Sequence, residues 1–136
     1  MNNGRFAISV HILTLLAKAE TEVLSSEFLA RSININPVLV RKEISNLRQA
    51  GLVSTKEGKN GGTYLARAPR QIRLSEVYEL VRPPALLGLC KNAPNPHCPV
   101  GQQINQHLDQ LYADADRALA EQLGTWSLAD FVQKFG

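Results

Sequence analysis

The segment 36–69 constrains the fold most strongly, because it reads as a helix followed at once by a β-hairpin. Asn36 can cap a helix, and Pro37 fits the first helical position, where its missing N–H leaves no hydrogen bond unmade. Gly51 is expected to end the helix in a left-handed conformation. Apolar residues at helical spacing predict the buried face: Val40, Ile44 and Leu47, with Leu39 beside them.

The hairpin is predicted from alternation and turn chemistry. Residues 52–56 are strand-like, and residues 63–66 form the return strand. The sequence EGKNGG lies between them, and Gly58, Gly61 and Gly62 are each able to take positive φ in the turn. A short hairpin with basic residues near its tip therefore follows the helix directly.

Two further helices are expected before this segment. Residues 3–19 carry apolar side chains around much of a helix, and Ser25 is a plausible cap for a two-turn helix over residues 25–33. The residues of the short helix expected to point inward are Phe28, Leu29 and Ile33. A short helix, a tight turn and a longer helix form a helix-turn-helix. With the hairpin, the expected fold is mainly α with a small β-wing, a winged helix-turn-helix.

Charge divides the chain into two unequal parts. Residues 1–73 contain eleven Lys and Arg against five Asp and Glu, whereas residues 74–136 contain four against seven. A basic part suggests a polyanionic partner, and here double-stranded DNA is expected. The alternative is a recognition-type helix whose basic residues merely keep its surface solvated.

The DNA-binding candidates lie on the outward face of the helix after Pro37 and at the hairpin tip. A helix of this size enters the major groove, and a basic hairpin can contact phosphates or the minor groove beside it. The candidate residues are Asn36, Pro37, Val38, Arg41, Lys42, Ser45, Lys56, Lys59 and Asn60. Arg48 or Gln49 extends the same helix face.

The acidic part is predicted to form a dimer. Ser75 is expected to cap a short helix with Val77, Leu80 and Val81 inward, and Pro83 and Pro84 stop it. A long helix then follows, ending at Gly124, and its apolar stripe keeps a heptad-like rhythm suited to packing on a second copy: Ile104, Leu108, Leu111, Ala115, Ala118, Leu119 and Leu123. A last small helix is anchored by Trp126, Leu128, Phe131 and Phe135. Packing of the long helix within its own chain alone is the alternative.

Both cysteines of the chain lie in the loop before the long helix, in LCKNAPNPHCPVG. Pro99 suits the first helical position, which makes Cys98 the candidate cap, and the positive end of a helix favours a thiolate there. Lys91 lies beside Cys90 and acts in the same direction. Oxidation of Cys90 and Cys98 would reshape the hinge between the two parts of the chain. Two inert thiols are the alternative.

Length and composition narrow the classes of protein to which the chain can belong. A chain of 136 residues is one domain by size, in which residues 1–73 are expected to bind DNA and residues 74–136 to supply a linker helix, the cysteine loop and dimerisation helices. No transmembrane run or signal peptide is seen, so a cytoplasmic protein with no membrane partner is expected. A thiol oxidoreductase is disfavoured because no Cys-x-x-Cys occurs, and no enzymatic activity is expected. An aromatic content of 6% argues against stacking on single-stranded RNA.

Nearly the whole chain resembles the Rrf-two family of bacterial winged-helix regulators, which includes IscR, NsrR and CymR. The resemblance rests on RFAISVHILTLLA near the start, on residues 36–81, and on a cysteine-containing loop before a long helix. NPHCPVG and NPVLVRK look closest to the YwnA-like branch. The resemblance implies a homodimer on a palindromic operator, usually acting as a repressor, with the predicted groove and wing residues at the DNA.

The resemblance also raises the question of a cofactor. Iron–sulfur members carry three cysteines in this loop and a fourth ligand that varies, whereas this chain has Cys90 and Cys98 only. His107 is the remaining candidate ligand, and His97 adjoins Cys98 too closely to share a metal with it. Because a cluster normally takes four ligands, no cofactor is expected, and a cluster-sensing regulator is the alternative.

Overall fold

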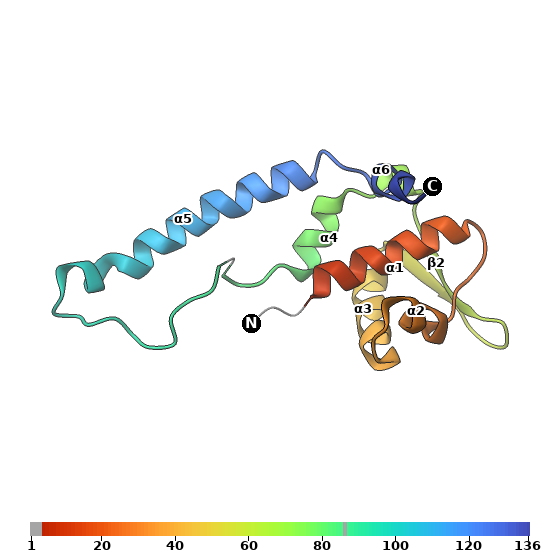
Figure 1. Cartoon of the computed structure of the whole chain (residues 1–136), viewed down its shortest axis with the longest axis horizontal. Coiled ribbons are helices and arrows are strands. Elements are labelled where there is room, and N and C mark those ends of the chain that lie inside the picture. Colours follow the sequence, from red (N-terminus) through yellow and green to blue (C-terminus); the bar gives the residue numbers. More distant parts are fainter. Residues whose placement is uncertain (1–3, 86) are drawn as a thin grey trace.

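The computed structural model describes residues 4–85 and 87–136, and its main body is helical with one small sheet (Figure 1). The elements in chain order are α1 (Arg5–Ala19), α2 (Ser26–Ile33), α3 (Pro37–Gln49), β1 (Val53–Lys56), β2 (Gly62–Leu65), the 3-10 turn η1 (Pro69–Gln71), α4 (Leu74–Val81), α5 (Pro99–Leu123), α6 (Leu128–Val132) and the 3-10 turn η2 (Gln133–Phe135). The expected mainly α fold with a β-wing is confirmed. Residue 3, expected in the first helix, lies outside the described residues. None of the helices in the described part of the chain is both long enough and apolar enough to cross a membrane.

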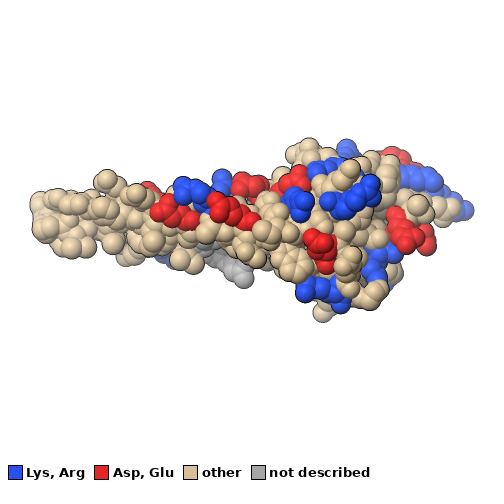
Figure 2. Space-filling model, turned by 90° about the horizontal axis from the view of Figure 1, so that it is seen from above, with Lys and Arg blue, Asp and Glu red and all other residues tan. Residues whose placement is uncertain are grey.

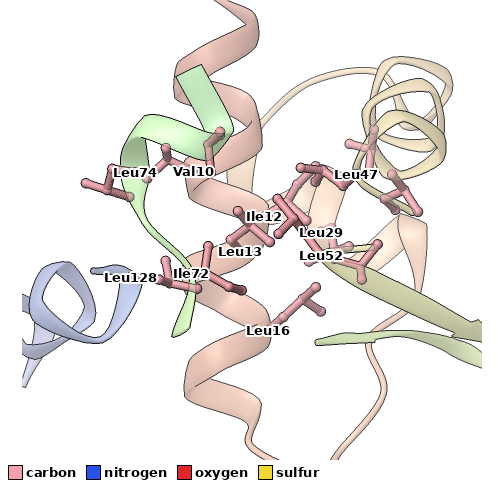
Figure 3. Close-up of a cluster of buried hydrophobic side chains, with 14 of the residues drawn as sticks. Val10, Ile12, Leu13, Leu16, Leu29, Leu47, Leu52, Ile72, Leu74 and Leu128 are labelled. Carbon is pink, nitrogen blue, oxygen red and sulfur yellow. The ribbon is translucent and has the colours of Figure 1, made fainter. Parts of the chain in front are cut away.

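The core is built around α1. Ile12, Leu13 and Leu16 are buried. On one side they meet side chains from α2, from α3 and from the start of the wing. On the other side they meet the residue Ile72 before α4, the helix α4 itself and α6 (Figure 3). The partners on the two sides are Leu29, Val40, Leu47, Leu52, Ile72, Leu74, Val77 and Leu128. Burial of this many aliphatic side chains supplies the main driving force for folding.

The predicted helix ends are confirmed for α2 and α3. The Ser25 hydroxyl oxygen accepts from the Phe28 N–H at 3.1 Å, and Asn36 Oδ1 accepts from the Val38 N–H at 2.8 Å. Pro37 occupies the first turn of α3, and Gly51 lies at φ 80° just after the helix. These local signals act over a few residues, which is why the sequence predicts them well.

The wing is a two-stranded antiparallel hairpin in which Val53 pairs with Leu65 and Lys56 with Gly62. The backbone of Leu24 exchanges two hydrogen bonds with Thr63, at 3.0 and 2.9 Å, and so ties the wing to the segment before α2. A Cβ on Gly62 would lie 2.6 Å from the Leu24 carbonyl oxygen, so this close approach requires glycine.

Of the three glycines able to take positive φ, Gly58 does so, at φ 90°, whereas Gly61 and Gly62 do not. The second left-handed residue is Asn60, at φ 65°, a conformation that asparagine tolerates. Gly61 is needed for space, because a Cβ there would lie 2.1 Å from the Lys56 carbonyl oxygen.

Three apolar residues expected to point inward are exposed. Phe28 is 42% exposed, with the Arg31 guanidinium 6.0 Å from its ring, because the short α2 buries only Leu29 and Ala30. Leu39 is 48% exposed on the flank of α3, and Phe135 is exposed beyond α6. A stripe read from helical spacing includes such flanking residues, although tertiary packing covers only its centre.

The start of α4 also differs from the prediction. Ser75 is not the cap, because the helix begins at Leu74. The Glu76 carboxylate accepts from the Arg73 N–H at 2.8 Å and from Arg67 Nη1 at 2.9 Å. Its bond to Arg67 holds the pKa of Glu76 below its usual value. The first turn is therefore fixed by a glutamate inside the helix.

Candidate nucleic-acid interface

The outward face of α3 carries the candidate groove residues. Val38, Arg41, Lys42 and Ser45 are all exposed, while Val40, Glu43, Ile44 and Leu47 are buried. At 3.6 residues per turn, Val38, Lys42, Ser45 and Gln49 lie directly opposite the buried side. The structure thus brings the predicted helix residues together on one exposed face.

The three cations of this helix face have different surroundings. Arg41 Nη1 lies 3.6 Å from the Glu27 carboxylate of α2, and both side chains are exposed. Arg48 Nη1 donates to Thr55 Oγ1 of β1 at 3.2 Å. Lys42 has no ion-pair partner among residues 4–85 and 87–136, so its ammonium group is the cation most available to a phosphate.

Asn36 and Pro37 shape the beginning of α3. Because Asn36 Oδ1 already accepts from the Val38 N–H, this oxygen serves the helix cap. Pro37 fixes the backbone of the first turn. Both residues therefore set the position of the exposed Val38 side chain that follows them.

The wing candidates lie beyond α3 on the same body. Lys56 ends β1, and Lys59 and Asn60 form the turn, with all three side chains exposed. In Figure 2 blue atoms gather at the end of the body that holds the wing. Because Arg48 bonds to Thr55, the wing is tied to α3. This bond sets the position of the basic residues of the wing relative to those of α3.

The helix α5 extends from the body as an arm (Figure 1). None of its 25 residues is buried, although apolar side chains recur along it, and Leu111 is 59% exposed. The outer end of this arm shows neither blue nor red in Figure 2, in keeping with residues 99–108, which contain no Lys, Arg, Asp or Glu. A long apolar stripe left in water indicates a surface that packs on another molecule.

A partly buried cluster that joins α1, α4 and α5 was missed from the sequence. The Tyr78 hydroxyl donates to Asp116 Oδ1 at 2.5 Å, Arg82 pairs with the other oxygen of Asp116, and the Phe6 ring meets the Tyr78 ring edge-on at 6.2 Å. Burial, followed by the bond to Asp116, raises the pKa of Tyr78 to about 12. This cluster fixes the direction in which the arm leaves the body.

A partly buried ion pair between Arg5 and Glu43 was also missed from the sequence. Glu43 is 4% exposed although it lies in α3, and its carboxylate accepts from Arg5 Nε at 2.9 Å and from Asn46 Nδ2 at 3.2 Å. The signal in the sequence is a glutamate between Val40 and Ile44 on the inward face. The sequence alone does not name the arginine 38 residues away that pairs with it.

The cysteine loop ends at α5 as predicted. Cys98 is the N-cap residue and Pro99 the first helical residue, although the Cys98 side chain makes no capping hydrogen bond. The Cys98 N–H donates to the Asn95 carbonyl oxygen at 3.2 Å, and Gly101 has no room for a Cβ, which would lie 2.4 Å from that oxygen. Cys90 and Cys98 are both free thiols and exposed.

The ligands present in one chain do not fit an iron–sulfur cluster. No group of three or more His, Cys, Asp or Glu side chains able to hold a metal occurs in the part of the chain that the structure describes. His107 lies 3.4 Å from Gln103 Oε1, one turn earlier on α5. Since a cluster takes four ligands, Cys90, Cys98 and His107 form no complete set within the chain.

Comparison with known proteins agrees with this architecture. The family model of Rrf2, described as an iron-dependent transcriptional regulator, matches residues 2–134. The chain belongs to the Rrf2 family. It is therefore a DNA-binding transcriptional regulator, as the resemblance of its motifs implied.

Individual relatives match this Rrf2-family chain over nearly its whole length. YwnA of Bacillus subtilis, named as an HTH-type transcriptional regulator, is 39% identical over 132 residues, or 97% of each chain. A crystal structure described as a transcriptional regulator from Lactobacillus plantarum is 27% identical, with a TM-score of 0.81 over 97% of this chain and 89% of that one. CymR, the global cysteine regulator of Bacillus subtilis, shares the fold at 20% identity, with a TM-score of 0.71 over 98% and 97% of the two chains.

Proposed function

We propose that this Rrf2-family chain acts as a homodimer that binds an inverted-repeat operator and represses transcription from it. Residues 1–73 bind the DNA, and residues 74–136 join the two copies. The proposal rests chiefly on the outward face of α3, which exposes Val38, Arg41 and Lys42 while its other side is buried in the core. A repressor of this kind acts on chromosomal DNA in the cytoplasm, without a membrane partner.

Reading of the operator is assigned to two groups of residues. Val38, Arg41, Lys42 and Ser45 contact base edges and phosphates in the major groove, with Asn36 and Pro37 setting the helix start. Lys56, Lys59 and Asn60 contact the flanking backbone or minor groove. Arg41 exchanges the exposed Glu27 carboxylate for a phosphate, because a pair between two exposed side chains is weak.

Dimerisation is supported by α5. A helix of 25 residues with no buried side chain gains stability when its apolar stripe packs on a second copy. A two-fold dimer presents two copies of α3, and successive major grooves on one side of a duplex lie about one helical turn apart. The inverted repeat follows from that symmetry.

Gel-shift titration on DNA upstream of the gene for this chain tests the proposal. Lys42→Ala is expected to weaken binding about tenfold and to reduce the dependence of log affinity on log salt by about two, because the dimer loses one phosphate contact in each half-site. Lys91→Ala, which removes an exposed lysine from the cysteine loop, away from α3 and the wing, is the matched control. If Lys42→Ala binds as tightly as the parent with the same salt dependence, α3 does not meet the DNA as proposed.

The cysteine loop is proposed to regulate this DNA binding. Cys90 and Cys98 are exposed in the loop that enters α5, so a disulfide between them would alter the base of the arm. In this step the two thiols give up two protons and two electrons to peroxide, which is reduced to water as the S–S bond forms. A thiol oxidoreductase would use the same residues in turnover, and no observation favours it.

Thiol counting before and after peroxide, paired with gel shifts, tests the switch. The account predicts that two thiols are lost and operator affinity changes, and that Cys98→Ser abolishes both effects. Unchanged affinity after complete oxidation would contradict it. A brown protein after purification without oxygen would instead establish the cluster-sensing alternative.

A further inference from the structure

The first turn of α1 contacts both α3 and the helix α4, to which the arm is joined. Arg5 Nε donates to Glu43 Oε2 of α3 at 2.9 Å, and Arg5 Nη2 donates to Oε1 of the same carboxylate at 3.3 Å. The next residue, Phe6, meets the Tyr78 ring of α4 edge-on, with 6.2 Å between the ring centres. Figure 1 shows the N-terminal end of α1 beside α3 and α4. Adjacent side chains of a helix point about 100° apart, so this one turn holds two different elements.

The contact with α3 restricts direction as well as distance. Two nitrogen atoms of Arg5 donate to the two oxygen atoms of Glu43, and Asn46 Nδ2, one turn further along α3, also donates to Oε1 at 3.2 Å. The Glu43 side chain is only 5% exposed. A fork of two hydrogen bonds between arginine and a carboxylate sets the relative orientation of the groups that it joins. The pair therefore holds α3 in one rotation about its own axis relative to α1.

The contact with the arm is made through Asp116. The Tyr78 hydroxyl donates to Asp116 Oδ1 at 2.5 Å, and Arg82, at the end of α4, donates to Oδ2. Arg82 also lies 3.5 Å from the Glu79 carboxylate of α4. None of the residues of α5 is buried, so the direction of this helix depends on these polar contacts more than on a packed apolar face. Phe6 thus contacts the residue whose hydroxyl group holds the arm.

The arm converts a small change of angle into a large displacement. At a rise of 1.5 Å per residue, about 25 Å of helix lies between Asp116 and Pro99. A swing of about 8° at Asp116 therefore moves the outer end of α5 by about 3.5 Å, close to the rise of about 3.4 Å for one base pair. A small difference in the angle between the arm and α3 is thus equivalent to a change of one base pair in the separation of two half-sites.

We propose that Arg5 and Phe6 are positioning residues that hold α3 and α5 at one fixed angle, and that this angle sets the half-site spacing that the dimer accepts. Neither side chain needs to contact DNA. Arg5 acts on α3 through Glu43, and Phe6 acts on α5 through Tyr78. The fixed angle is a property of a single chain, whereas its effect on operator spacing rests on the proposed function.

The angle is measured without DNA, from the distances between two spin labels. The labels are attached at Gln49→Cys on α3 and at Gln106→Cys on α5, both exposed positions, in the full chain with Cys90→Ser and Cys98→Ser. An excess of unlabelled chain leaves one pair of labels in each assembly. Double electron–electron resonance then gives the distribution of distances within one chain.

Two conservative variants loosen the angle without leaving a buried charge unpaired. Arg5→Lys keeps the charge but loses the fork, and Phe6→Leu keeps an apolar side chain but loses the ring contact. Because about 15 Å of helix separates Asp116 from Gln106, a swing of about 8° should broaden the distance distribution by about 2 Å in each variant. Arg70→Lys, an exposed substitution in η1, is the matched control and should leave the distribution unchanged.

Gel shifts measure the effect on operator spacing. The affinity for an inverted repeat at the spacing that the parent prefers is divided by the affinity for the same operator lengthened by one base pair. This ratio should fall about fivefold in Arg5→Lys and in Phe6→Leu, while the salt dependence stays that of the parent because no phosphate contact is lost. A variant that is only less stable would bind both operators more weakly and leave the ratio unchanged.

The two measurements separate the two parts of the proposal. A distance distribution as narrow as that of the parent, in either variant, would show that the substituted residue does not set the angle, and would overturn the proposal. Broader distributions with an unchanged ratio would show that the angle does not set the spacing. A parent that binds an inverted repeat no better than a single half-site would refute the proposed dimer on DNA, and the distance measurement, made without DNA, would still decide whether the angle is fixed.

Discussion

Val38 presents a branched apolar side chain, 60% exposed, at the start of the otherwise polar candidate reading face of α3. In the major groove the distinctive apolar feature is the 5-methyl group of thymine. We therefore expect Val38 to contact a thymine in each operator half-site. Replacing that thymine by deoxyuridine, found by scanning each thymine in turn, should weaken binding about fivefold, or roughly 1 kcal/mol.

The matched protein variant separates this contact from general damage to the site. Val38→Ala should bind more weakly than the parent and lose its sensitivity to deoxyuridine at that one position. Other thymines of the half-site serve as internal controls. If Val38→Ala responds to every deoxyuridine as the parent does, the isopropyl group reads no methyl group.

The ion pair between Arg5 and Glu43 makes a prediction about stability. Replacing Arg5 by methionine leaves a carboxylate that is 4% exposed without its main partner, which should lower the free energy of unfolding by about 3 kcal/mol. Urea denaturation of the variant measures this. The double variant Arg5→Met/Glu43→Met should recover most of the loss, because no buried charge remains.

Arg31→Met on α2 is the control for this measurement, since Arg31 is exposed and only lies over the Phe28 ring. A loss in Arg5→Met no greater than in Arg31→Met would show that the pair contributes little. If the double variant is no more stable than Arg5→Met, the loss of stability comes from altered packing and not from the unpaired charge of Glu43.

Individual residues were predictable where the signal is local. Ser25, Asn36 and Cys98 stand at the helix starts expected from their own neighbours in sequence. Glu43 and Asp116 were missed because each is held by a residue 38 positions away, a distance at which sequence spacing carries no information. Phe28 and Leu39 were misplaced because helical spacing does not state how wide the covered face is.

At the scale of elements, the joint between α4 and α5 predicts a titration. Because the pKa of Tyr78 is raised to about 12 in the fold, its neutral phenol stabilises the protein below pH 10, the ordinary pKa, and that contribution is lost as pH rises toward 12. Asp116→Asn removes the second cause of the shift but not burial. We expect the pKa of Tyr78 to fall part of the way toward 10 in ultraviolet tyrosine titration.

Asp109→Asn, an exposed substitution on the same helix, should leave the tyrosine titration unchanged. The loss of stability between pH 10 and pH 12 should be smaller in Asp116→Asn than in the parent, because the two pKa values of Tyr78, folded and unfolded, lie closer together. A Tyr78 pKa that stays near 12 in Asp116→Asn would mean that Asp116 does not hold the hydroxyl and that burial alone accounts for the shift.

The elements themselves were largely readable from the sequence. Strong periodicity and clear end signals predicted α1, α2, α3, the hairpin and α5 close to their observed bounds. The start of α4 was misplaced because Glu76 and Arg67 fix it through a side-chain contact that no local cap signal shows. An apolar groove between α1 and α6 was not predicted, because it depends on how α6 packs back on the first helix.

At the scale of the whole molecule, the apolar stripe of α5 makes a prediction about assembly. Leu111→Asp places a charge in the middle of the proposed interface and should raise the dimer dissociation constant about a hundredfold without loss of helical content. Sedimentation equilibrium measures the constant. Gln110→Asp, one position away and off the stripe, is the matched control, and equal effects of the two substitutions would place the interface elsewhere.

The overall arrangement of the molecule could not be predicted from the spacing of residues in the sequence. The sequence indicated a long helix suited to a partner, but it did not show that the helix leaves the body as an arm with no buried residue. That arrangement depends on Tyr78, Arg82 and Asp116, which come together only in the folded chain. In the proposed dimer, the arm converts a single DNA-reading head into a pair.

The stoichiometry of the protein on an inverted-repeat operator tests the central claim most directly. Sedimentation of the complex, with half-site centres about one helical turn apart, should give two chains per duplex. Inserting five base pairs between the half-sites, about half a turn, should abolish tight binding because the two copies of α3 would face opposite sides of the DNA. One chain per duplex, or binding unaffected by the insertion, would contradict the account.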